Sequence, residues 1–113
     1  MKEMKDKQVL IVGMARSGVA AARMLSRLGA KLTLTDTRNS EQMASAIEQL
    51  RDIDANWQLG VEPDALIEGK DYIILSPSVY YWAPWVEKAK QNGTEVVSEL
   101  QLGAWFTQGD FVA

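Results

Sequence analysis

Residues 9–18 read VLIVGMARSG, and this stretch decides how the chain folds. Four apolar residues lead directly into Gly13, Gly18 follows five positions later, and small residues then recur at helical spacing. This order predicts a buried parallel strand, a tight turn and the start of a helix. Such a junction brings unpaired backbone N–H groups and the positive end of a helix dipole to one point. The stretch therefore predicts a seat for a phosphate group.

The composition of the 113-residue chain is typical of a soluble globular domain, with 47% hydrophobic and 24% charged residues. A net charge of −3 disfavours a nucleic-acid partner, because neutralising phosphates needs a basic surface. The longest apolar runs are too short to span a membrane, and the charged N-terminus lacks the apolar region of a signal peptide. With no Cys and no His, the chain lacks thiol chemistry and the commonest general base and metal ligand. These absences favour a cytoplasmic binding domain.

Strand and helix patterns alternate along the rest of the chain. Strands are expected at 8–12, 31–35, 57–59, 71–75 and 94–97, with another beginning at 111–113. Helices are expected at 17–28, from 39 onward, at 84–91 and at 99–107, with a single helical turn at 63–67. Because no two adjacent strands make a convincing hairpin, this order favours an α/β fold, an open parallel sheet of about five strands with helices on both faces. The last strand has no room to finish, so we expect residues 1–113 to be one domain of a longer protein.

The motif at residues 13–18 is GxAxxG, one glycine short of the dinucleotide-binding fingerprint. Gly13 permits the sharp turn, and Gly18 permits close packing of the helix on the strand. The middle glycine of the fingerprint lets a pyrophosphate approach the backbone, and Ala15 places a methyl group there. A well-packed turn without a ligand is the alternative. The strand–turn–helix context favours a phosphate or nucleotide role.

Polar residues follow the strand expected at 31–35. Asp36 lies 18 residues after Gly18, where dinucleotide folds place an acid that binds a ribose hydroxyl. Thr37 and Arg38 add a hydroxyl group and a cation beside it. A helix cap or a solvated loop is the alternative for Asp36. The position favours a functional role, because ligands of open α/β sheets bind beyond the carboxyl ends of the strands.

Ser76, Pro77 and Ser78 follow the strand expected at 71–75 in the same way. Alone they read as an ordinary turn, whereas together with the other two strand ends they make one coherent site. Serine without a nearby histidine, and carboxylates scattered over helices, do not form a reaction centre. We therefore predict a binding site with no catalytic residue and no metal ligand.

Local patterns make finer predictions. The KLTLT alternation at 31–35 predicts a strand with one better-buried face, and Asn39 followed by Gln42 predicts a helix N-cap. Trp57 and Trp105 are expected to pack in the core. The aromatic residues at 80–82 and 85 have no burial pattern, so stacking on a ligand, packing and a partner surface all stay open.

Taken in order, the motifs resemble the N-terminal domain of the UDP-N-acetylmuramoyl-L-alanine:D-glutamate ligases, the MurD family. The resemblance covers essentially the whole chain. It rests on KQVLIVGMARSGVAAARML at 7–25, TDTR at 35–38, ILSPS at 74–78, GTEVVSELQL at 93–102 and the final FVA. The glycine motif alone is weak, but the ordered set is fairly specific. Family members continue past such an FVA segment into a GTNGK(T/S) phosphate-binding loop.

The resemblance implies a cytoplasmic ligase of peptidoglycan synthesis that depends on ATP and Mg²⁺. Such an enzyme joins D-glutamate to UDP-N-acetylmuramoyl-L-alanine through an acyl phosphate. This chain would be its Rossmann-like UDP-binding domain, which uses no NAD, carries no cofactor and is not catalytic alone. ATP, Mg²⁺ and D-glutamate would bind to the central and C-terminal domains, its partners in the same chain. The implied substrate contacts are Gly13, Arg16, Ser17, Gly18, Asp36, Thr37, Arg38, Ser76, Pro77 and Ser78.

The chain departs from the family pattern at Ser78, where the family has glycine followed shortly by a proline. Serine lacks the freedom of glycine to adopt positive φ, so either the loop is reshaped or the chain is a divergent relative. Two other functions stay open. One is an NAD(P)-binding module of an oxidoreductase, which Ala15 and Arg38 disfavour. The other is a non-catalytic interaction domain, for which the aromatic run at 80–82 is the best support.

Overall fold

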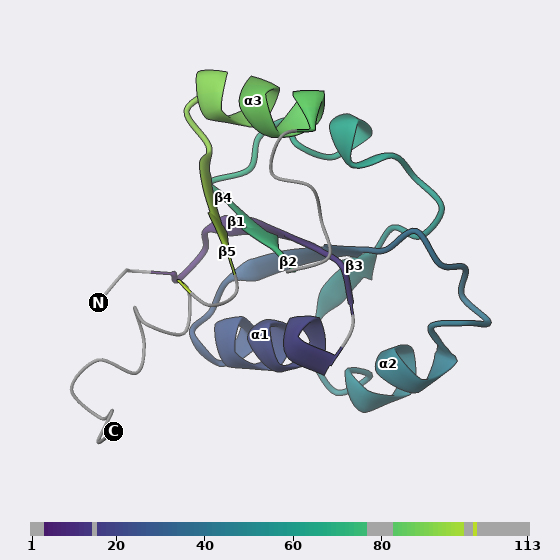
Figure 1. Cartoon of the computed structure of the whole chain (residues 1–113). Helices are drawn as coiled ribbons and strands as arrows, with labels where there is room; N and C mark the ends of the chain where they lie inside the picture. The colour runs from purple at the N-terminus through teal and green to yellow at the C-terminus, as the bar shows by residue number, and fades with distance from the viewer. Residues whose placement is uncertain (1–3, 15, 77–82, 99–100, 102–113) are drawn as a thin grey trace.

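The computed structural model describes residues 4–14, 16–76, 83–98 and 101. Within them the chain forms a five-stranded, all-parallel sheet in the order β3-β2-β1-β4-β5 (Figure 1). The strands are β1 (Gln8–Val12), β2 (Lys31–Thr35), β3 (Ala55–Trp57), β4 (Tyr72–Leu75) and β5 (Glu95–Ser98). The helices are α1 (Arg16–Arg27), α2 (Ala44–Gln49) and α3 (Pro84–Gln91), with a 3₁₀ turn η1 (Pro63–Ala65). The predicted α/β fold is thus confirmed.

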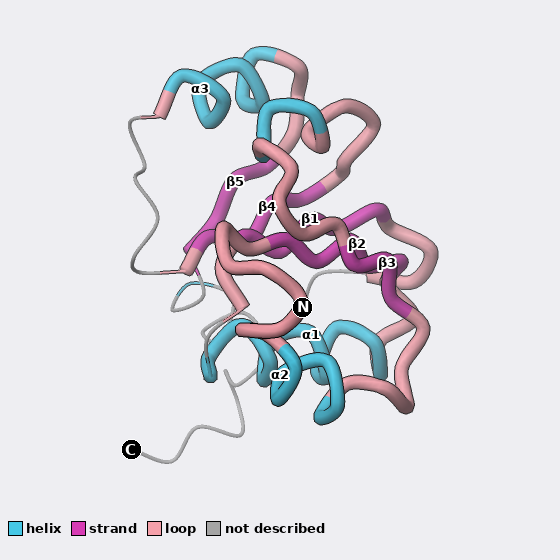
Figure 2. The backbone as a smooth tube through the Cα atoms, turned by 90° about the vertical axis from the view of Figure 1, so that its right-hand side faces the viewer, coloured by secondary structure: helices cyan, strands magenta, loops and turns pink. Residues whose placement is uncertain are grey.

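Helices cover both faces of the sheet, which explains why β1 and β4 are predominantly apolar. Helices α1 and α2 lie on one face and α3 lies on the other, as two views at right angles show (Figures 1 and 2). The core under α1 and α2 includes Val9, Ile11, Ala22, Leu25, Leu32, Leu34, Met43, Leu50, Ile74 and Val97. The core under α3 contains Leu10, Val12, Ile67, Ile73, Leu75, Val86 and Ala89.

Strand β2 is more buried than its sequence pattern predicts. The alternation of Leu and Thr predicted one better-buried face, but Thr33 is 7% exposed and Thr35 is 1% exposed. The prediction was wrong because β2 lies inside the sheet between β1 and β3, with both faces covered. Threonine is tolerated at these positions because its β-branched side chain suits a pleated surface.

Other element boundaries differ in smaller ways. The strand expected at 57–59 lies at Ala55–Trp57, where it pairs with residues 32–34 of β2. The Asn39 N–H donates to Gln42 Oε1 (3.0 Å), and the Gln42 N–H donates to Asn39 Oδ1 (2.9 Å). This reciprocal pair caps a turn that precedes α2, so regular helix begins later than predicted. Of the expected helix at 99–107 only residue 101 is described, and it is helical. The strand at 111–113 and Trp105 lie outside the described residues.

The order of the strands creates a switch point at the centre of the sheet. The chain moves from β1 to β2 and β3 on one side, then returns to β4 and β5 on the other side of β1. In register, Ile11 of β1 therefore faces Leu34 on one side and Ile74 on the other. Crevices that bind ligands in open α/β sheets lie beyond the carboxyl ends of the strands at such a point.

Candidate functional site

The ends of three strands are hydrogen-bonded together at the carboxyl edge of the sheet. The Gly13 N–H, just after β1, donates to the Thr35 carbonyl at the end of β2 (2.9 Å). The Ser76 N–H, just after β4, donates to the Val12 carbonyl at the end of β1 (3.1 Å). The structure therefore brings together the three segments that the sequence placed at one site.

The glycines of the loop after β1 perform the two roles predicted for them. Gly13 has a φ of 95°, a left-handed conformation that favours glycine. A Cβ atom on Gly18 would lie 2.3 Å from the Gly13 carbonyl oxygen, closer than any side chain tolerates. Helix α1 can therefore begin directly against the end of β1.

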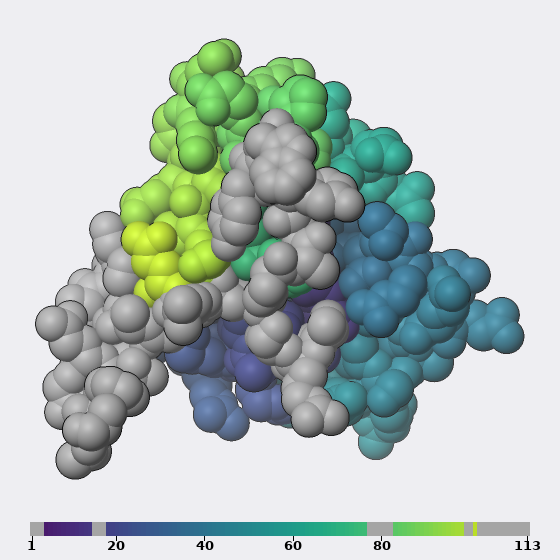
Figure 3. Space-filling model, in the orientation of Figure 1, coloured from purple at the N-terminus to yellow at the C-terminus, as the bar shows by residue number. Residues whose placement is uncertain are grey.

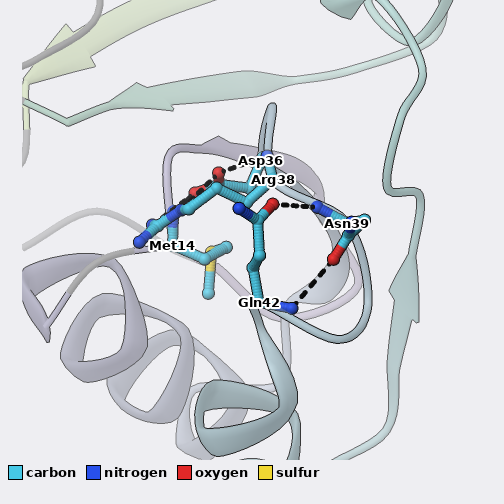
Figure 4. A network of polar contacts seen from close by, with 5 residues as sticks. All are labelled: Met14, Asp36, Arg38, Asn39 and Gln42. Atoms are coloured by element: carbon cyan, nitrogen blue, oxygen red, sulfur yellow. Dashed lines mark hydrogen bonds and ion pairs between the residues drawn. The ribbon is translucent and has the colours of Figure 1, made fainter.

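Asp36 forms a closed cluster with the loop and with Arg38, shown in Figure 4. Its side chain is buried, and Oδ2 accepts the Met14 N–H at 2.7 Å. The Arg38 backbone N–H donates to Oδ1 at 2.9 Å. The Arg38 guanidinium donates through Nε to Oδ1 and through Nη2 to Oδ2, each at 2.9 Å. We call these three residues, Met14, Asp36 and Arg38, the carboxylate clamp.

The clamp keeps both of its charged groups ionised at neutral pH. The side-chain hydrogen bond from Arg38, together with the two backbone N–H donors, lowers the pKa of Asp36 from 3.8 to about 2, against the opposing effect of burial. The same side-chain hydrogen bond raises the pKa of Arg38. Bidentate pairs of this type are among the stronger ionic contacts in proteins. The clamp as a whole is neutral, so the acid adds little repulsion toward an anionic ligand at this edge.

Helix α1 supplies the positive element of the site. It begins at Arg16, immediately after the loop, runs for 12 residues and has no acidic residue in its first turn. Its first N–H groups lack acceptors within the helix, and its dipole places partial positive charge there. The arrangement is suited to an anion such as a phosphate. The side chains of Arg16 and Ser17 lie outside the described part of the structure.

The segment after β2 forms the outer wall of the site. In the space-filling view this segment, in blue, adjoins the purple atoms of the β1–α1 junction (Figure 3). Thr37 is exposed, and the Arg38 side chain is 45% exposed although it is paired with Asp36. On the β4 side, Ser76 is buried. Ala15, Pro77 and Ser78 lie outside the described residues.

Sequence reasoning did not single out Met14. Its side chain is 1% exposed, and its backbone N–H links the loop to Asp36 across 22 positions of sequence. Any residue except proline would offer the same N–H group at this position, so the residue type carries almost no signal. Only the position of the loop against the end of β2 reveals the contact.

The chain matches the family model of the Mur ligase MurD-like N-terminal domain over residues 7–98. It belongs to this family. Among its relatives is the UDP-N-acetylmuramoylalanine–D-glutamate ligase of Geobacter sp. (strain M21), 38% identical over 111 residues, which cover 98% of this chain and 25% of the relative. The ligase of the same name from Geotalea daltonii is 39% identical, with coverage of 98% and 24%. This MurD-like domain therefore spans about a quarter of the length of these curated relatives.

Solved structures support the fold of this MurD-like domain. A shikimate dehydrogenase from Aquifex aeolicus superposes with a TM-score of 0.55 at 18% identity, covering 91% of this chain and 46% of that one. At this level of identity the likeness concerns the fold alone. It confirms the Rossmann-like architecture and adds nothing in favour of an NAD(P)-dependent oxidoreductase.

Other features of the MurD-like domain are structural. Trp57 is partly buried against the core under α1 and α2, as predicted, and Trp85 packs against the core under α3. The aromatic run at 80–82 lies outside the described residues. Over the described ranges, no three Asp, Glu, His or Cys side chains are grouped so as to hold a metal ion. No helix within these ranges is long and apolar enough to cross a membrane.

Proposed function

We propose that this domain binds the UDP part of UDP-N-acetylmuramoyl-L-alanine, within a ligase of peptidoglycan synthesis that adds D-glutamate to this substrate using ATP. The observation that carries the proposal is the meeting of the α1 N-terminus with the ends of β1, β2 and β4 at the switch point. Family membership and the ligase names of the relatives support the choice of substrate. They also support the cytoplasmic location that we expect for such an enzyme.

In this proposal the diphosphate lies at the N-terminus of α1. The free N–H groups of the first turn and the helix dipole stabilise its negative charges. Gly13 and Gly18 allow the loop conformation that holds the diphosphate. We assign direct contacts with the phosphates to Arg16 and Ser17. Because the carboxylate clamp is neutral as a whole, it lies beside the diphosphate without repelling it.

The uridine then lies toward the segment after β2, where Thr37 and Arg38 are exposed. We assign Asp36 to this subsite as the residue that holds Arg38 in place. Ser76, Pro77 and Ser78 are assigned to the side of the diphosphate and sugar, at the end of β4.

We place the chemistry of the ligase outside this domain. The domain spans about a quarter of its relatives' length, and its sequence has no histidine to serve as the base of a nucleophile. ATP and Mg²⁺ would supply the acyl-phosphate chemistry on the central and C-terminal domains of the same enzyme. The role of the present chain is to bind and orient the nucleotide end of the substrate.

The proposal is tested by NMR titration of the ¹⁵N-labelled chain with UDP and with UDP-N-acetylmuramoyl-L-alanine. We expect chemical-shift changes that concentrate at residues 13–18 and 36–38. Uridine without phosphate is the matched control, and it should leave the α1 N-terminus unperturbed. An absence of shifts in both segments at millimolar UDP would overturn the assignment.

A further inference from the structure

The carboxylate of Asp36 is already saturated by donors from its own chain. An ionised carboxylate offers about four acceptor positions. The N–H groups of Met14 and Arg38 occupy one position on each oxygen, and Nε and Nη2 of Arg38 occupy the other two. With Asp36 only 7% exposed, little of its surface remains for a ligand.

This state differs from the role of the corresponding acid in dinucleotide-binding folds. There the acid at the end of the second strand accepts a hydrogen bond from a ribose hydroxyl of NAD. In NADP-binding folds a nearby arginine accommodates the 2′-phosphate instead. Here the Asp36 carboxylate and the Arg38 guanidinium are hydrogen-bonded to each other. Neither group is therefore available to an adenosine ribose.

The carboxylate clamp also includes the Met14 N–H, a backbone donor of the loop after β1. The Met14 N–H points to Asp36 Oδ2 at 2.7 Å, a short contact typical of a charged acceptor. This N–H is therefore unavailable to a pyrophosphate lying across the turn. Within the described part of the chain, the first turn of α1, which starts at Arg16, offers donors to a diphosphate.

We propose that Arg38 is a specificity-determining residue that closes the Asp36 carboxylate and thereby excludes nicotinamide adenine dinucleotides from this Rossmann-like site. The inference rests on the proposed nucleotide-binding role of the carboxyl edge. The two backbone donors to Asp36 do not depend on the Arg38 side chain. Its removal therefore opens one acceptor position on each oxygen, as a ribose diol requires.

The test compares the parent chain with Arg38→Ala by NMR titration with NADH and with NADPH, followed at the amides of residues 13–18 and 36–38. We expect the parent to bind both dinucleotides weakly, and its titrations give the reference Kd values. In Arg38→Ala the Kd for NADH should fall by about tenfold or more, since two hydrogen bonds to a charged acceptor are gained. NADPH should gain nothing, because the opened carboxylate repels its 2′-phosphate.

The sequence has Ala15 where the dinucleotide-binding fingerprint has its middle glycine. The comparison is therefore repeated with Ala15→Gly and with the double variant Ala15→Gly/Arg38→Ala. Ala15→Gly alone should not bind NADH, whereas the double variant should bind it at least as tightly as Arg38→Ala. Arg51→Ala is the matched control, because Arg51 pairs with Glu48 on the surface, away from this edge (3.2 Å). It should behave as the parent.

The inference is overturned if the parent binds NADH as tightly as Arg38→Ala does. It is also overturned if removal of Arg38 improves NADH and NADPH binding equally, or improves neither in both backgrounds. UDP is titrated in parallel. If UDP fails to bind the parent, the proposed function is wrong, while the NADH comparison still decides the role of Arg38.

Discussion

At both edges of the sheet, an aspartate side chain accepts a hydrogen bond from a backbone N–H group in or next to β1. The two aspartates differ in their burial and in their other hydrogen-bond partners. At the carboxyl edge the Met14 N–H donates to the side chain of Asp36 (2.7 Å). At the amino edge the Gln8 N–H donates to Oδ2 of Asp71 (2.8 Å), just before β4. Asp36 is buried and doubly bonded to an arginine side chain, whereas Asp71 is exposed.

Because of this difference, the hydrogen bonds of the two aspartates should contribute unequally to the stability of the fold. An exposed carboxylate keeps much of its hydration, so its hydrogen bond contributes little to stability. A buried carboxylate needs all of its acceptor positions filled, and removing a partner leaves an uncompensated polar group. The stronger electrostatic contacts therefore lie at the carboxyl edge, where Asp36 is buried and paired with Arg38.

The largest expected effect on stability comes from removing the charge of Asp36. Asp36→Asn removes the charge and turns an amide donor toward the donors of the clamp, so the free energy of unfolding should fall by about 3 kcal/mol. Asp71→Asn, the matched change at the amino edge, should cost about 1 kcal/mol or less. Urea unfolding of both variants measures the comparison. Equal losses at the two edges would contradict it.

The pH dependence of stability should come next in size. Because folding lowers the pKa of Asp36 from 3.8 to about 2, the unfolded chain binds the proton more readily. The stabilisation is therefore fully present above about pH 4 and is lost as the pH falls toward 2, an effect of about 2 kcal/mol.

Other carboxylates titrate over the same range, so the parent chain is compared with Asp36→Asn in urea unfolding from neutral to acidic pH. The stability difference between the two proteins should shrink as the pH falls below 4. Two parallel curves would show that Asp36 is not the group responsible.

An effect of similar size is expected from the packing of the loop after β1 against α1. Gly18→Ala places a Cβ atom against the Gly13 carbonyl, which should cost about 3 kcal/mol. Better helix propensity offsets about 1 kcal/mol of this, leaving a net loss of about 2 kcal/mol.

Ala20→Gly, at an exposed position of the same helix, measures the propensity contribution alone and should cost about 1 kcal/mol. Thermal or urea unfolding of the two variants separates packing from propensity. If Gly18→Ala were instead stabilising, the close approach of α1 to the end of β1 would not constrain the loop.

Much of the fold was predictable because its signals are local. The apolar run at 8–12 and the alternating pattern at 31–35 became β1 and β2 with the expected bounds, and Pro84 began α3 as expected. The burial of Thr33 and Thr35 was not predictable, since alternation reports side-chain type and not what covers each face. The strand expected at 57–59 was shifted because its pairing with β2 sets its register.

For the site, sequence reasoning predicted that the segments after β1, β2 and β4 meet at one edge, as they do in the structure, but it did not predict the hydrogen bonds of Asp36 to Met14 and Arg38. Contacts of the ten predicted residues with a substrate stay a prediction. The structure places Gly13, Gly18, Asp36 and Ser76 at the carboxyl edge. Pro77 and Ser78 lie outside the described residues.

The sequence by itself determined the order of strands and helices, the glycine positions and the strand ends that meet at one edge. These follow from hydrophobic periodicity and from backbone conformations that only certain residues adopt. The contact between the Met14 N–H and Asp36 became visible only in the folded structure. Met14 and Asp36 lie 22 positions apart, and hydrogen-bond partners over that separation depend on how β1 and β2 align. Strand register, which no local pattern encodes, thus adds the Met14 N–H to the local pair of Asp36 and Arg38.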